Sequence, residues 1–145
     1  MNLYLDCEFN EFKGALISMA LASEDGHEWY EVVPCETPGS WVAANVIPIL
    51  GKPPISVAEL SRSLHGFLSQ FDAVHIVADW PEDIAHFCTA LIVGPGMRID
   101  TPPLTMEVLR VDATSAMPHN ALADARGIRD FLTTEQPATA PAGGE

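Results

Sequence analysis

The chain has 145 residues, 48% of them apolar, and this length fits one domain with a substantial buried core. Its formal net charge is −13, because 20 acidic residues face only 7 basic ones, and this argues against broad electrostatic capture of nucleic acid. The charge does not exclude an enzyme that acts on phosphate esters, since bound cations invert the local field.

The first predicted element is a strand over Leu3–Phe9, an apolar run that contains two carboxylates. Side chains of a strand alternate between its faces, so Asp6 and Glu8 should share one face while Cys7 points to the other. Two buried carboxylates repel each other unless they are protonated, hydrogen-bonded or neutralised by a cation. Oxygen ligands suit Mg²⁺ or Mn²⁺, so the pair is a candidate metal site.

Two more strands are expected directly after the first one. The apolar run 15–22 is short enough for a buried strand, and residues 27–33 are rich in aromatic and β-branched side chains. Asp25-Gly26 lies between these runs and favours a tight hairpin turn. The first three strands should therefore form an antiparallel meander.

The middle of the chain predicts two helices and a strand. A short helix is expected over 41–47 with Ser40 as its cap, and a longer one over 57–71 with Ser56 as its cap. Apolar residues recur at helical spacing in the longer segment. The apolar run 73–78 should form a strand, and the order strand, helix, strand implies a parallel connection.

The C-terminal third predicts a helix, a strand and a last helix. The first helix should run from Pro81 to Leu91, with Asp79 as a candidate cap. A strand is expected over 105–109 and the last helix over 121–132. Together these elements predict an α/β fold.

One domain over 1–135 and a disordered tail over 136–145 are expected, because the tail has no large apolar residue. No apolar run reaches the roughly 18–20 residues that span a bilayer, and the start of the chain lacks a signal-peptide pattern. Cys7, Cys35 and Cys88 show no Cys-x-x-Cys spacing and are interpreted as reduced packing residues. We expect a cytoplasmic protein without membrane contact.

Two further carboxylates and a histidine lie near the ends of predicted elements. Asp83 is in the first turn of the helix after strand 73–78, and ligands bind beyond the carboxyl ends of such strands. Asp124 is in the last helix, and His119 should lie in the loop before it or at its start. Each alone could be a helix cap or a solvated residue. The joint pattern of four carboxylates and one histidine favours a site.

The order Asp-x-Glu, a helix-borne Asp and His-x-Ala-x-x-Asp resembles the DEDDh 3′–5′ exonucleases of the ribonuclease H-like superfamily. Residues 6–9, 39–42 and 119–126 are similar to motifs of a short bacterial branch related to the mycobacterial DEDDh exoribonuclease. The resemblance covers residues 3 to 132. It implies a ribonuclease H-like mixed five-stranded sheet, an antiparallel three-strand meander plus parallel strands, flanked by helices.

The resemblance also implies a metal site with four ligands and a general base. The ligands would be Asp6, Glu8, Asp83 and Asp124. Two Mg²⁺ or Mn²⁺ ions would clamp the attacking and leaving oxygens at phosphorus, and His119 would take the proton from the attacking water. Asp79 stands where many relatives have Asn, which leaves open whether Asp79 or Asp83 is the third ligand. Asp83 fits better, because Ile84 and Phe87 follow it with the relatives' spacing.

The implied substrate is single-stranded RNA or a short oligonucleotide, shortened from its 3′ end to release nucleoside 5′-monophosphates, with DNA and a homodimer left open. Phe9, Phe12 and Trp80 are candidate base-stacking surfaces, although core packing is the alternative for each. Arg126 could contact the substrate backbone, or could be solvated or ion-paired. A ribonuclease H-type endonuclease and a module that binds nucleic acid or protein without turnover remain alternative functions.

Overall fold

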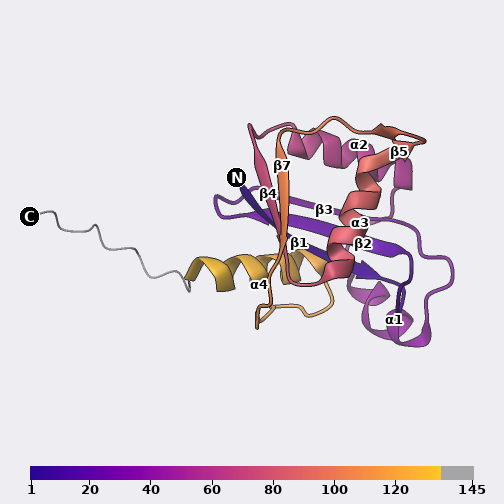
Figure 1. Cartoon of the computed structure of the whole chain (residues 1–145). Helices are drawn as coiled ribbons and strands as arrows, with labels where there is room; N and C mark the ends of the chain where they lie inside the picture. Colours follow the sequence, from indigo (N-terminus) through magenta and orange to yellow (C-terminus); the bar gives the residue numbers. More distant parts are fainter. Residues whose placement is uncertain (135–145) are drawn as a thin grey trace, which may run out of the picture.

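Five strands form one mixed sheet in the computed structural model, which describes residues 1–134 (Figure 1). The strands are β1 (Asn2–Phe9), β2 (Leu16–Ser23), β3 (Glu28–Val32), β4 (Val74–Ala78) and β7 (Leu104–Val108). They lie in the order β3-β2-β1-β4-β7, so β1 is the central strand. The tail predicted to be disordered, 136–145, lies outside the described residues.

The strand directions confirm the predicted meander and the parallel connection. β1 pairs with β2, and β2 with β3, in antiparallel fashion. β1 and β4 are parallel, and so are β4 and β7. The β2–β3 turn is tight, with Gly26 at φ 92° and the His27 backbone N–H donating to Ser23 Oγ. Gly26 supplies the positive φ that this turn requires, a conformation that glycine adopts without steric cost.

Within residues 1–134, four α-helices and a 3₁₀ turn accompany the sheet: α1 (Ser40–Asn45), η1 (Ile47–Ile49), α2 (Val57–Leu68), α3 (Pro81–Leu91) and α4 (Ala121–Thr134). Ser56 caps α2 as predicted, in a capping box with Glu59. The other two cap predictions are wrong. Gly39, not Ser40, is at the cap position of α1, and Trp80, not Asp79, is at that of α3.

A small hairpin of β5 (Ile92–Gly94) and β6 (Met97–Arg98) follows α3. The sequence did not predict it, because Gly94-Pro95-Gly96 is equally typical of a helix end. Gly96 has φ 64°, a left-handed conformation that suits the turn of this hairpin.

Helices cover both faces of the sheet (Figure 1). On one face, Leu3, Leu5 and Cys7 of β1 belong to the large core that includes residues of α2 and α3. On the other face, Tyr4 packs with Ile128 of α4. The alternation predicted for β1 is thus confirmed, and it directs the next two even-numbered residues, both carboxylates, toward α4. No helix among residues 1–134 is both long and apolar enough to cross a bilayer.

Candidate functional site

Five carboxylates gather at one end of the central strands. Asp6 and Glu8 lie in the C-terminal half of β1, and Asp79 directly follows β4. Asp83 and Asp124 are in the first turns of α3 and α4. β1 and β4 are parallel and Leu5 pairs with Ala78, so Asp79 leaves the end of β4 beside Asp6, which is still paired with Ala20 of β2.

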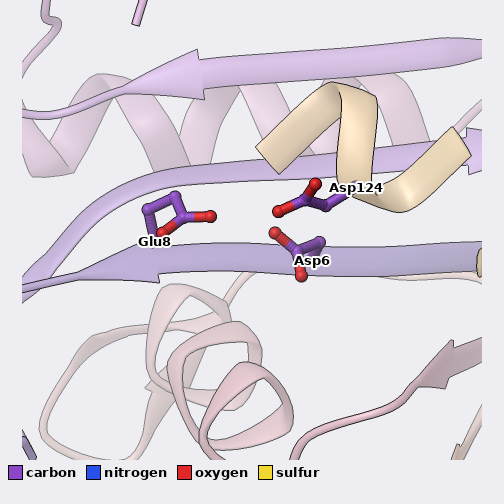
Figure 2. A group of neighbouring side chains, drawn as sticks. All are labelled: Asp6, Glu8 and Asp124. Atoms are coloured by element: carbon purple, nitrogen blue, oxygen red, sulfur yellow. The ribbon is translucent and has the colours of Figure 1, made fainter. Parts of the chain in front are cut away.

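The carboxylates form two overlapping groups. One oxygen each from Asp6, Glu8 and Asp124 lies within 4.8 Å of the others, and Figure 2 shows Asp124 reaching from α4 toward the two β1 side chains. Asp6, Asp79 and Asp83 form the second group with the same spacing. Ligands on opposite sides of a six-coordinate Mg²⁺ lie about 4.2 Å apart. Each group could therefore hold one divalent ion, with Asp6 shared between the two ions.

Two of these carboxylates have buried oxygens that nothing in the described part of the chain satisfies. Asp83 is only 2% exposed, and its Oδ2 has no hydrogen-bond partner among residues 1–134. Oδ2 of Asp6 is buried and lacks a partner in the same way. A buried anion without a partner is costly, whereas a bound cation would compensate it. The orphaned oxygens therefore fit the presence of a metal ion.

Burial and mutual repulsion raise the pKa values across the site. Burial, followed by the neighbouring Asp124, raises the pKa of Glu8 to about 8. Burial, followed by the charge of Asp79, raises the pKa of Asp83 to about 8. Burial most of all, then the charges of Asp83 and Asp124, holds the pKa of Asp6 well above its usual range. Without a cation, the site keeps protons at neutral pH.

The start of α4 is fixed by Asn120. Its Oδ1 accepts a hydrogen bond from the Ala123 backbone N–H (3.1 Å), which is an N-cap contact, and its Nδ2 donates to the Ile49 carbonyl (3.0 Å). The cap defines where the helix begins, and the second contact ties that point to η1. Together they set the position of Asp124 relative to β1.

His119 lies in the loop before α4, as predicted. Its backbone N–H donates to Asp124 Oδ2 (3.1 Å), and its φ of 71° is left-handed. Its exposed ring meets the ring of Trp41 edge-on, with 4.8 Å between centroids. The structure thus joins His119 to the carboxylates through its backbone and places the imidazole against Trp41.

Two pockets open beside the carboxylates. A pocket of about 450 Å³ is lined by acidic residues of the site together with four aromatic residues: Phe9, Phe12, Trp41 and Trp80. Phe12, Trp41 and Trp80 are 82%, 53% and 56% exposed, so their rings are available to a ligand. A second pocket, of about 430 Å³, is bordered by Asp6, Asp79 and Asp124. The two pockets therefore meet at Asp6 and Asp79, which border both of them.

The remaining predicted site residues differ in their surroundings. Phe9 is half-buried and packs against the ring of His86, with 5.3 Å between centroids. Trp80 is exposed at the pocket, where its Nε1–H donates to Glu82. Arg126 forms an ion pair with Glu28 and lines neither of the two pockets. Of the alternatives considered for Arg126, the structure therefore shows the ion pair.

Trp41 was not predicted as a site residue. The segment Gly39-Ser40-Trp41-Val42 was the available signal, because it is one of the motifs that carry the family resemblance. Its contact with His119 joins residues 78 positions apart, which no local pattern predicts.

No model of a known protein family matches the chain, and no curated protein matches it. What the molecule can do must therefore follow from its own residues. The features that can indicate a function are two overlapping carboxylate groups, buried carboxylate oxygens without a partner, a histidine beside Asp124 and exposed aromatic rings at the adjacent pocket.

Proposed function

We propose that the chain is a metal-dependent 3′–5′ exonuclease of the DEDDh type with a ribonuclease H-like fold. The observation that carries this proposal is the pair of carboxylate groups that share Asp6. Two ions about 3.5–4 Å apart are the usual arrangement for in-line displacement at a phosphate, and a shared carboxylate is a simple way to hold them. The mixed five-stranded sheet with helices on both faces is compatible with this fold.

Four carboxylates of the chain would hold the two ions. Glu8 and Asp124 would hold one ion and Asp83 the other, with Asp6 between them. When bound, two such ions orient the scissile phosphate, activate the attacking water and stabilise the negative charge that develops. The carboxylates also fix the direction of attack, because they come from rigid elements, β1, α3 and α4.

His119 would act as the general base. An imidazole is the side chain best suited to accept a proton at neutral pH. The backbone hydrogen bond to Asp124 holds the histidine next to one carboxylate of the site, and its exposed ring would have to turn from Trp41 toward a bound substrate. Catalytic contacts often tighten only when substrate binds.

The substrate would be single-stranded and preferentially RNA or a short oligonucleotide. Exposed rings at the 450 Å³ pocket offer stacking surfaces for unpaired bases. The charge of −13 disfavours a long duplex, whose binding depends on many cationic contacts. The resemblance to exoribonucleases favours RNA over DNA.

The test is incubation of 5′-labelled single-stranded RNA and DNA with the full chain in Mn²⁺ or Mg²⁺. We expect a ladder of products shortened from the 3′ end, release of nucleoside 5′-monophosphates and no reaction in EDTA. A circular RNA should resist cleavage, because it has no 3′ end. Cutting of the circle would instead support an endonuclease, and no cleavage of any substrate would contradict the proposal.

A further inference from the structure

We propose that Asp79 is a fifth metal ligand, which holds the second of the two ions together with Asp6 and Asp83. This inference rests on the proposed function, and it deepens it by assigning a residue that the four-carboxylate pattern leaves out. It also resolves the choice between Asp79 and Asp83, since both would bind the same ion.

The backbone places Asp79 beside Asp6. Leu5 of β1 pairs with Ala78 of β4 in a parallel ladder, so Asp6 and Asp79 are the next residues of adjacent strands. One carboxylate oxygen of Asp79 lies within 4.8 Å of oxygens of both Asp6 and Asp83. Asp79 also borders both pockets, as Asp6 does. Asp79 therefore lies beside Asp6, the carboxylate that both groups share.

The orphaned oxygen of Asp83 points independently to a ligand at this place. Asp83 is 2% exposed, and its Oδ2 has no hydrogen-bond partner among residues 1–134. It lines the larger pocket together with Asp6 and Asp79. A cation between these three side chains would satisfy the buried oxygen, whereas another carboxylate beside it without a cation only adds repulsion.

Asp79 does not act as the N-cap of α3, although this is the common role of an aspartate just before a helix. Here the cap position of α3 belongs to Trp80, and no side-chain hydrogen bond closes the start of that helix. Asp79 is thus half-buried next to two other carboxylates without serving the helix.

The negative charge of Asp79 should affect both metal binding and the stability of the metal-free protein. Four carboxylates would neutralise two divalent ions, whereas five leave one negative charge in excess. The fifth carboxylate should strengthen binding of the second ion and make the metal-free site less stable. Removing its charge should therefore weaken metal binding and stabilise the metal-free protein.

The test is titration of the full chain with Mn²⁺, in which free Mn²⁺ is followed by electron paramagnetic resonance and heat by calorimetry. Asp79→Asn is compared with wild type and with Glu82→Gln. Glu82 is the control, because it lies three residues after Asp79 in the first turn of α3 and its charge reaches Asp83, yet it belongs to neither carboxylate group. Circular dichroism establishes that each variant is folded.

We expect two Mn²⁺ per wild-type chain, and a loss of about 10-fold or more in affinity for one of them in Asp79→Asn. Glu82→Gln should bind both ions nearly as wild type does. Metal-free Asp79→Asn should also unfold at a higher temperature than wild type. If Asp79→Asn binds two ions as tightly as Glu82→Gln, the role of Asp79 is refuted while the proposed function stands. If the wild type binds no Mn²⁺, both are refuted.

Discussion

At the scale of single residues, strand alternation predicted more of the site than any other signal. It placed Asp6 and Glu8 on one face of β1 and Cys7 in the opposite core, and the structure confirms this. Asp83 and Asp124 could be proposed from their positions near helix starts. The place of Asp79 beside Asp6 could not be settled, because it depends on the register between β1 and β4.

The role of His119 can be separated from its backbone conformation. Its φ of 71° is unfavourable for most residues but tolerated by Asn, so His119→Asn removes the imidazole with little strain. We expect the catalytic rate with oligonucleotide to fall about 10²–10⁴-fold. Mn²⁺ affinity should stay near that of wild type, because the backbone N–H still donates to Asp124. If the rate of His119→Asn equals that of wild type, His119 is not the general base.

At the scale of elements, the order and type of the main strands and helices could be predicted, since each segment has a clear periodicity. The ends were less predictable: α2 stops at Leu68 instead of 71, and two cap predictions were wrong. The approach of α4 to the sheet was not predicted either. It depends on small residues in both layers, with Ala20 and Ala22 of β2 packed against Ala121 and Ala125.

Gly127 is needed for α4 to lie where Asp124 meets β1. A Cβ at this position would collide with the backbone carbonyl of Thr114. We expect Gly127→Ala to lower the free energy of unfolding by about 1–2 kcal/mol, since the clash outweighs the gain in helix propensity. The melting temperature should fall by roughly 3–8 °C, and Mn²⁺ should bind more weakly because Asp124 shifts with the helix.

Gly66 provides the control for this prediction. It is an exposed glycine within α2, and a Cβ there would meet nothing within 4 Å. Gly66→Ala should therefore stabilise the protein by about 0.5–1 kcal/mol and leave Mn²⁺ binding unchanged. Equal thermal shifts for the two variants would show that the contact with Thr114 has no influence.

For the molecule as a whole, the raised pKa values of the site make the free energy of unfolding depend on pH. Glu8 and Asp83 have pKa values of about 8 in the fold, against usual values of 4.5 and 3.8. At a pH between about 4 and about 8, Glu8 and Asp83 therefore bind more protons in the folded state than in the unfolded chain. Their contribution to stability is thus fully present at low pH and lost as pH rises toward 8.

The metal-free protein should therefore become less stable as pH rises from about 5 to about 8 in EDTA. Mn²⁺ should raise the melting temperature more at pH 8 than at pH 5, because the carboxylates must lose their protons to bind it. Thermal denaturation at both pH values, with and without metal, measures this difference. Glu8→Gln should reduce the pH dependence, and a wild type whose stability does not change with pH would contradict the raised pKa values.

Shortening of RNA by wild type and by Asp6→Asn tests the two-ion site most sharply. Asp6 belongs to both carboxylate groups, so its loss disrupts both ion sites at once. With 5′-labelled single-stranded RNA and Mn²⁺, we expect the wild type to shorten the RNA stepwise from its 3′ end. Asp6→Asn should be at least about 10³-fold slower although it is folded, and Glu82→Gln should remain active. An inactive wild type, or full activity in Asp6→Asn, would contradict the account.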